Sequence, residues 1–119
     1  MVPLLIVLLA AVLAFLWFRR TPLELFTLQS LKQFNGTNGK TYIAVDGLVF
    51  DVSASEAYKP DGSYAVLAGA DCSVCLAKMS LEPGQLNKQV DLSVSERKTL
   101  DEWTAYMKKK YRVIGKLQP

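Results

Sequence analysis

Histidine is absent from this chain of 119 residues. Its absence excludes Ser-His-Asp hydrolysis, zinc sites of the H-E-x-x-H and Cys2His2 types, and any haem held by imidazole. A strong excess of positive charge is also missing, because 14 Lys and Arg face 11 Asp and Glu. Nucleic acid is therefore not expected as the main partner, since phosphate binding needs a concentrated basic stripe. Any metal or cofactor must be held by groups other than imidazole.

The length allows one ordinary domain and an appendage, since domains contain roughly 100–150 residues. The appendage is residues 2–18, an uncharged and almost wholly apolar run. As a helix it would rise roughly 26 Å, which barely spans a bilayer core of about 30 Å. We interpret it as an uncleaved transmembrane anchor, because no Lys or Arg precedes it and bulky residues 15–18 prolong it. The alternative is a cleaved secretory signal, with Val12 and Ala14 at the cleavage site.

Arg19 and Arg20 follow this run directly and predict its orientation. Under the positive-inside tendency, residues 21–119 face the cytosol and the N-terminus lies across the membrane, by default that of the endoplasmic reticulum. We expect residues 19–24 to form a short linker and residues 25–117 to form the folded domain. If the apolar run is cleaved instead, the protein is secreted.

Hydrophobic periodicity in the first half of the domain predicts both helices and strands. Thr27 is placed to cap a short helix over residues 28–34, because its side chain can accept a hydrogen bond from an N-terminal amide. Two β-branched runs flank Asp46-Gly47, which predicts a β-hairpin. Apolar spacing over residues 63–79 then predicts a helix.

The second half of the domain predicts one more helix and one more strand. Ser93 and Glu96 have the spacing of a capping box, and an apolar stripe follows them. The helix would end in Lys108, Lys109 and Lys110, cations that suit a helix C-terminus. Residues 111–117 are expected to form a final strand. Together these elements predict an α+β domain on a membrane anchor.

Three tyrosines are candidates for a binding site. Tyr58 and Tyr64 bracket K-P-D-G-S, a turn that is expected to project both rings near the mouth of the following helix. Tyr111 directly follows the three lysines at positions 108–110. Tyrosines commonly bury the ring and leave the hydroxyl at the rim, so their spacing alone indicates no special role.

Cys72 and Cys75 form a C-x-x-C motif, which is typical of a redox pair or of half a metal site. A zinc site takes four ligands, and these are the only cysteines in the sequence. No thioredoxin-like βαβ pattern surrounds them. We interpret them as buried small residues in a reducing cytosol. A redox protein, or a four-thiolate site shared across a dimer, are the alternatives.

Four ordered sequence blocks resemble the membrane-associated progesterone receptor family, a branch of the cytochrome b5-like haem/steroid-binding domains. The blocks are FTLQSLKQFNG, YIAVDGLVFDV, YKPDGSYAVLAGAD and KYRVIGKL. They extend over about residues 25–117, and four ordered blocks are much more specific than one short motif. The segment AKMSLEP further resembles the secreted neudesin branch, which keeps the secreted alternative open.

The resemblance implies a cytochrome b5-like α+β domain that binds b-type haem non-covalently, through a tyrosine phenolate on one face of the iron. Tyr64 matches that metal ligand, and Tyr58 matches the tyrosine that supports the site by hydrogen bonding. Lys110 and Tyr111 match the residues that close the pocket from the last helix. The absence of histidine agrees with such a site.

The resemblance also implies a function without catalysis. A single protein ligand leaves the other face of the iron open to a second haem in a haem-mediated homodimer, to a small molecule or to a partner protein. In the family the partners are haem-thiolate monooxygenases and the setting is sterol metabolism. The alternative is a haem-free module for a sterol or another apolar ligand, or a secreted neudesin-like signalling protein. Lys59 and Ser63 depart from the family pattern, which usually has a small residue and a proline there.

Overall fold

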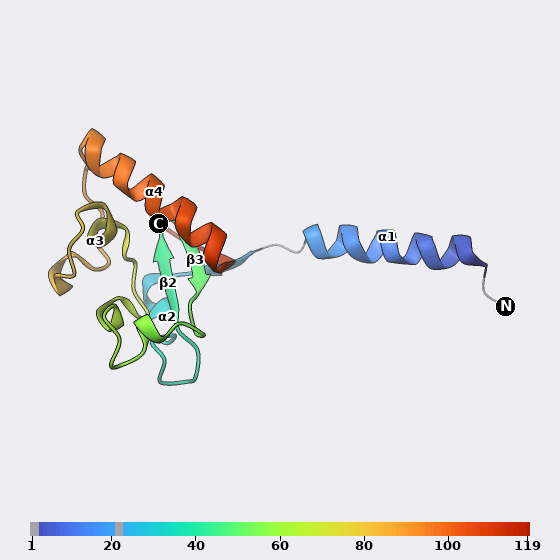
Figure 1. The fold of residues 1–119 in the computed structure, drawn as a ribbon, viewed down its shortest axis with the longest axis horizontal. Helices are drawn as coiled ribbons and strands as arrows, with labels where there is room; N and C mark the ends of the chain where they lie inside the picture. The colour runs from blue at the N-terminus through green and yellow to red at the C-terminus, as the bar shows by residue number, and fades with distance from the viewer. Residues whose placement is uncertain (1–2, 21–22) are drawn as a thin grey trace.

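The computed structural model describes residues 3–20 and 23–119, and it shows a folded domain with one separate helix, α1 (Leu4–Arg20) (Figure 1). The remaining elements, in chain order, are β1 (Glu24–Phe26), α2 (Leu28–Lys32), β2 (Tyr42–Val45), β3 (Leu48–Asp51), the 3-10 turns η1 (Glu56–Tyr58) and η2 (Ala65–Leu67), α3 (Ser73–Ala77), the 3-10 turn η3 (Pro83–Gln85), α4 (Val94–Lys110) and β4 (Arg112–Leu117). The predicted α+β class is confirmed.

The strands form one sheet in the order β1-β4-β3-β2, in which only the β1–β4 pair is parallel. The predicted hairpin is confirmed as β2–β3, and its turn works because Asp46 and Gly47 both adopt positive φ, 51° and 79°. The predicted final strand is confirmed as β4. Strand β1 was not predicted, because three residues carry no readable periodicity.

Both faces of the sheet are buried. The larger core joins one face to α3, α4 and the 3-10 turns, and includes Ile43, Val45, Phe50, Val52, Tyr58, Leu67, Cys72, Cys75, Leu100 and Met107. The smaller core covers the other face and consists of Phe26, Leu31, Tyr42, Ala44 and Val49. This two-sided burial explains why β2 reads as a continuous apolar run rather than as an alternating one.

Capping boxes begin both of the helices for which a cap was predicted. The Thr27 hydroxyl accepts a hydrogen bond from the Ser30 amide at 3.0 Å. The Ser93 hydroxyl accepts from the Glu96 amide at 3.2 Å, and the Glu96 carboxylate accepts from the Ser93 amide at 2.9 Å. These reciprocal bonds satisfy amides that have no partner within the helix. They fix where α4 begins, and α4 forms one wall of the site described below.

The helix predicted over residues 63–79 is wrong as a continuous element. The segment forms η2 and α3, with extended chain between them that runs beside β2. There the Gly69 amide donates to the Tyr42 carbonyl at 2.8 Å, and the Cys72 amide donates to the Ala44 carbonyl at 2.8 Å. Gly69 has a φ of 75°, which interrupts helical geometry. Hydrogen bonding to the sheet therefore overrides the helical pattern.

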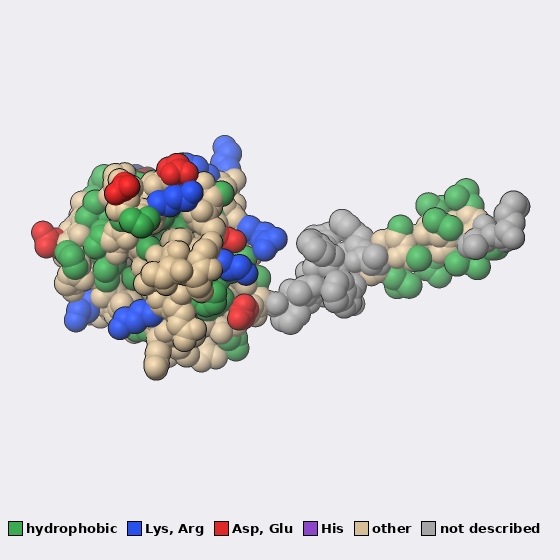
Figure 2. Space-filling view, turned by 90° about the horizontal axis from the view of Figure 1, so that it is seen from below, with side chains coloured by type: hydrophobic (Ala, Val, Ile, Leu, Met, Phe, Trp, Pro, Cys, Tyr) green, Lys and Arg blue, Asp and Glu red, His purple; other side chains and the backbone are tan. Residues whose placement is uncertain are grey.

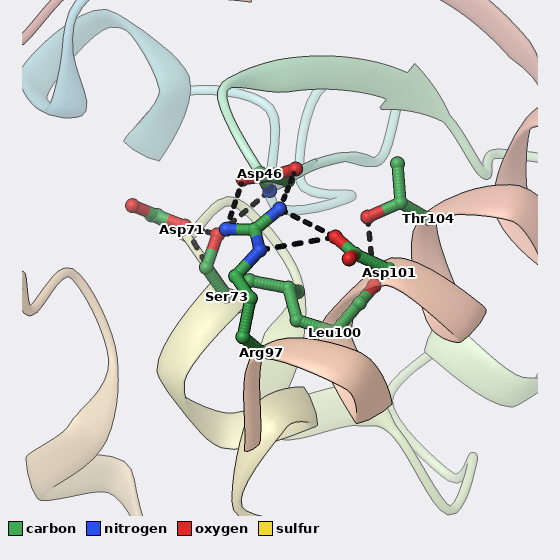
Figure 3. A network of polar contacts seen from close by, with 7 residues as sticks. All are labelled: Asp46, Asp71, Ser73, Arg97, Leu100, Asp101 and Thr104. Atoms are coloured by element: carbon green, nitrogen blue, oxygen red, sulfur yellow. Dashed lines mark hydrogen bonds and ion pairs between the residues drawn. The ribbon is translucent and has the colours of Figure 1, made fainter. Parts of the chain in front are cut away.

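A polar network fastens the hairpin turn to α4 (Figure 3). The Arg97 guanidinium donates to both carboxylate oxygens of Asp46, at 3.1 and 2.6 Å, and also to Asp101 at 2.6 Å. The Asp46 amide donates to the Ser73 hydroxyl at 2.8 Å, and that hydroxyl donates to Asp71 at 2.7 Å. The network thus joins β2–β3, α3 and α4 at the end of α4 where the helix begins.

The apolar run at the start of the chain forms α1, a helix of 17 residues. Its large apolar side chains between Leu4 and Leu13 are 52–76% exposed. None of the helices in the described part of the chain is long and apolar enough to cross a membrane. The transmembrane anchor predicted over residues 2–18 is therefore not supported, because 17 helical residues rise only about 26 Å. Residue 2 of that anchor and residues 21–22 of the predicted linker lie outside the described residues.

Candidate functional site

The turn between η1 and η2 brings Tyr58 and Tyr64 together. Gly62 lies so close to the Ala57 carbonyl that any Cβ at this position would collide with backbone atoms. This close approach lets the Tyr64 amide donate to the Ala57 carbonyl at 2.8 Å. The two tyrosine rings consequently lie 5.8 Å apart between centroids, tilted by 37°. Tyr64 is the residue that precedes η2, and its side chain makes no capping hydrogen bond.

The end of α4 brings Tyr111 to the same place. The Tyr111 amide donates to the Met107 carbonyl at 2.8 Å and closes the last turn of the helix. Its ring meets the Tyr58 ring edge to face, with centroids 6.2 Å apart and an interplanar angle of 80°. Tyr58 therefore lies between Tyr64 and Tyr111, although these two residues come from segments far apart in the sequence.

A cavity of about 400 Å³ lies between the η1–η2 turn and α4. All four residues singled out from the sequence line it, namely Tyr58, Tyr64, Lys110 and Tyr111. The other lining residues are Ala57, Met79, Thr99, Glu102, Trp103 and Tyr106. The volume is in the range of small-molecule pockets, which are typically lined by aromatic and apolar side chains with a few polar groups.

Sequence reasoning missed the wall that α4 contributes. Thr99, Trp103, Tyr106 and Lys110 follow one another at steps of four, three and four residues, so they lie on one face of the helix. The Trp103 ring meets the Tyr106 ring edge to face at 5.9 Å. The helical spacing of these residues is the signal in the sequence, but Trp103 also falls on the apolar stripe of the helix predicted after Ser93 and Glu96, which indicates a core position. Trp103 also packs against the larger core, so it belongs to both surfaces.

Tyr58 is held as a neutral phenol. Burial raises its pKa above the ordinary value of 10.0, and repulsion from Tyr111 raises that pKa further. The Tyr58 hydroxyl donates to the Met107 sulfur at 4.0 Å, and a thioether is a weak acceptor. The hydroxyl is therefore a proton donor at neutral pH that a stronger acceptor in the cavity could recruit.

Lys110 is a positioned cation at the edge of the cavity. Its ammonium donates to the Tyr106 hydroxyl at 3.0 Å and lies 5.5 Å from the ring centroids of both Tyr106 and Tyr111. The hydrogen bond to Tyr106 raises the pKa of Lys110, and the Tyr111 phenol raises it further. The lysine therefore remains charged and faces two electron-rich rings.

The oxygen atoms that line this cavity belong to four phenols, one hydroxyl and one carboxylate, namely those of Tyr58, Tyr64, Tyr106, Tyr111, Thr99 and Glu102. Across residues 3–20 and 23–119, no three or more Cys, Asp or Glu side chains cluster in a way that could hold a metal ion. A metal here would have to enter as part of a larger group that brings most of its own ligands. The phenols and the Lys110 ammonium, between aromatic walls, suit a planar apolar group with an acidic edge, and Glu102 is the acidic side chain of the lining.

Cys72 and Cys75 lie in the larger core, which also includes Tyr58, and they do not line the cavity. Both thiols are free, and their side chains are almost fully buried. The Cys72 thiol donates to the backbone carbonyls of Leu67 and Ala70. The Cys75 thiol donates to the backbone carbonyl of Glu82. Burial raises the pKa of each thiol, that of Cys72 most strongly. Protonated thiols bound to backbone carbonyls favour a structural role over redox chemistry.

Comparisons with known proteins find a family model, curated relatives and solved structures that are similar to this chain. A model described as "Cytochrome b5-like Heme/Steroid binding domain" matches residues 27–118. The chain is 35% identical over 96 residues to "Probable steroid-binding protein 3" of Arabidopsis thaliana, covering 77% of this chain and 96% of that protein. It also matches a solved Arabidopsis structure with a cytochrome b5-like fold, with a TM-score of 0.73, 35% identity and coverage of 82% and 93% of the two chains.

Two longer relatives match over the same region. "Cytochrome P450 regulator dap1" of Schizosaccharomyces pombe is 34% identical over 111 residues, which is 85% of this chain and 63% of that protein. Human "Membrane-associated progesterone receptor component 2" is 36% identical over 98 residues, which is 77% of this chain and 44% of that protein. The chain thus spans about half to two thirds of these two relatives.

Proposed function

Because this chain belongs to the cytochrome b5-like heme/steroid-binding domain family, in its membrane-associated progesterone receptor branch, we propose that its pocket binds haem. The observation that carries the proposal is the convergence of Tyr58, Tyr64, Lys110 and Tyr111 on one cavity of about 400 Å³. These residues come from two segments that are distant in the sequence, and their polar groups reach one cavity although Tyr58 also belongs to the larger core.

Tyr64 is the residue we propose as the metal ligand. A phenol is a good ligand only after it loses its proton, and the pKa of Tyr58 is raised, which disfavours that loss. Tyr64 lines the same cavity and is less buried than Tyr58. The nearby cation of Lys110 favours negative charge within the cavity. These differences divide the two tyrosines into a ligand and a neutral hydrogen-bond donor.

The remaining residues would hold the edges of the bound group. Tyr58, as a neutral phenol, is suited to donate a hydrogen bond to the Tyr64 oxygen, exchanging a weak sulfur acceptor for a charged one. Lys110 is suited to pair with a carboxylate at the edge of the porphyrin. Trp103 and Tyr111 offer flat aromatic surface in the lining of the cavity.

When bound, a haem with an anionic oxygen ligand would be held mainly in the ferric state, because such a donor stabilises Fe(III) over Fe(II). This supports a non-enzymatic role as a sensor, adaptor or regulator. The relative named as a cytochrome P450 regulator supports haem-thiolate monooxygenases as the class of partner. A second copy of the chain, meeting across the open face of the haem, is a further partner we propose.

We also propose that α1 holds the domain at a membrane, with the endoplasmic reticulum as the setting and the domain in the cytosol. Between Leu4 and Leu13, its leucines, isoleucine and valines are more than half exposed to solvent, and such a surface needs an apolar environment. Relatives with printed names that include "membrane" support this location.

A sterol is the second candidate ligand, because the cavity has apolar walls and a relative is named as a steroid-binding protein. In that case Tyr64 and Lys110 would hydrogen-bond a ligand oxygen, and no metal would be needed. The haem proposal requires the Tyr64 oxygen to bind iron as a phenolate. The sterol proposal requires only that this oxygen forms a hydrogen bond.

Titration of the full chain with ferric haemin, followed by visible absorption, tests the proposal. We expect saturable binding by the native chain and loss of the phenolate-to-iron band in Tyr64→Phe. The matched control is Tyr42→Phe, which removes the same atom from the smaller core. Binding without that band in the native chain would refute phenolate ligation. Absence of haem binding, together with sterol binding that survives Tyr64→Phe, would establish the second candidate instead.

A further inference from the structure

We infer that the end of the domain at which the chain enters β1 is a docking surface for an anionic lipid bilayer. Cations from the two ends of the chain converge there, beside the apolar helix α1. The inference rests on the proposed membrane association of α1 and adds a lipid class and a docking face.

The sheet topology brings the two ends together. Strands β1 and β4 are parallel, with Glu24 opposite Gly115, so β1 begins beside the middle of β4 and the chain enters it from the side of Arg112. Strand β4 in turn follows α4 directly, through Tyr111. The C-terminal end of α4 and the entry to β1 therefore lie at the same end of the domain (Figure 1).

This end carries a dense group of cations, which we call the basic end: Lys108, Lys109 and Lys110 in the last turn of α4, and Arg112 at the start of β4. All four side chains are exposed, and none of them forms an ion pair in the described part of the protein. Figure 2 shows Lys and Arg side chains, with some acidic ones, on the side of the domain that faces α1. Glu24 and Asp51 are the nearby acids, with Asp51 opposite Arg112 in the strand register. Positive charge is thus in excess at this end.

The sequence adds two more cations by tethering. Helix α1 ends in Arg19 and Arg20, and three residues of chain separate Arg20 from Glu24. Even fully extended, the four steps from the Cα of Arg20 to that of Glu24 span at most about 14 Å, so the Cα of Arg20 cannot lie farther than that from the start of β1. Six cations are therefore confined to the junction between an exposed apolar helix and the domain.

A junction of this kind fits the surface of an anionic lipid bilayer better than it fits a nucleic acid. Groups of four to eight Lys or Arg beside a membrane-bound helix are typical of binding to anionic lipids. An apolar helix of 17 residues, more than half exposed wherever its large side chains are described, has no counterpart in a nucleic-acid site. The bilayer supplies the apolar phase for α1 and the negative surface for the basic end together.

Partitioning of the full chain onto vesicles tests the inference. The measured quantity is the ratio of the partition coefficient on vesicles with about a third phosphatidylserine to that on pure phosphatidylcholine. Because α1 contributes to both coefficients equally, the ratio isolates the charge. Each exposed cation at an anionic surface raises the partition coefficient about fivefold. The double variant Lys108→Gln/Lys109→Gln should therefore lower the ratio about 25-fold. Salt at about 0.5 M should abolish the native preference.

The matched control is Lys88→Gln/Lys98→Gln, which removes the same charge from elsewhere. Lys88 lies beside Leu117 and Gln118 at the far end of β4, and Lys98 lies in the first half of α4. The inference requires this variant to keep the native ratio within about twofold. Equal losses in both variants, or no native preference for phosphatidylserine, would overturn it. If the chain binds vesicles that contain phosphatidylserine but does not bind pure phosphatidylcholine, only the proposed role of α1 is overturned.

Discussion

Gly62→Ala tests how the turn builds the site. A Cβ at this position would overlap the Ala57 carbonyl and the Glu56 oxygen, which are backbone atoms that no rotamer change can move. The turn would have to open, and the bond from the Tyr64 amide to the Ala57 carbonyl, 2.8 Å long, would stretch or break. Overpacking costs about 1–3 kcal/mol and a lost hydrogen bond costs about 1 kcal/mol more. We therefore expect the free energy of unfolding to fall by about 2–4 kcal/mol.

Urea unfolding followed by circular dichroism measures this loss, and haemin titration of the folded variant measures the effect on the site. Gly84→Ala is the matched control, because no atom lies within 4 Å of a Cβ built there. That variant should be unchanged or slightly stabilised, since alanine restricts the unfolded chain. If Gly62→Ala is as stable as Gly84→Ala and binds haemin as the native chain does, the close approach at Gly62 does not position Tyr58 and Tyr64.

Three further predictions concern stability. The pKa of Tyr58 is raised in the folded state, so its contribution to stability is complete well below pH 10 and is lost above it; in a pH series of urea unfolding, Tyr58→Phe should reduce the loss of stability there by up to about 1.4 kcal/mol per pH unit, while the buried Cys72 and Cys75 thiols cause a loss that remains in both chains. Met107→Ala empties a fully buried position beneath Tyr58 and should destabilise by about 2–5 kcal/mol in the same assay; a loss below 1 kcal/mol would contradict its place in the core. Arg97→Gln removes paired contacts to Asp46 that are partly exposed, and should cost about 1 kcal/mol at low salt and less at high salt. A loss for Arg97→Gln that is independent of salt would show that packing, not charge, is what Arg97 supplies.

Local signals in the sequence predicted the elements that are stabilised locally. Asp46-Gly47 specified the hairpin because both residues accept positive φ, and the Ser93–Glu96 box specified where α4 begins. The residues that line the cavity were partly predictable as well, through the family resemblance for Tyr64 and Lys110.

The remaining features depend on contacts between distant segments. The stretch around Gly69 has helical spacing, but its amides bond to β2, which no local pattern reveals. Strand β1 exists because β4 offers it an edge. Tyr106 lines the cavity because Ala57, Tyr58 and Tyr64, which are distant in the sequence, line the same space as its face of α4. The apolar run was predicted to span a membrane, and its helix is shorter than that role requires.

The most direct test of the central claim is resonance Raman spectroscopy of the full chain loaded with ferric haem. Excitation in the phenolate-to-iron band should enhance tyrosinate vibrations in the native chain and in Tyr58→Phe. The same vibrations should be absent from Tyr64→Phe. Tyrosinate vibrations that persist in Tyr64→Phe, or that vanish in Tyr58→Phe alone, would contradict the assignment of Tyr64 as the ligand.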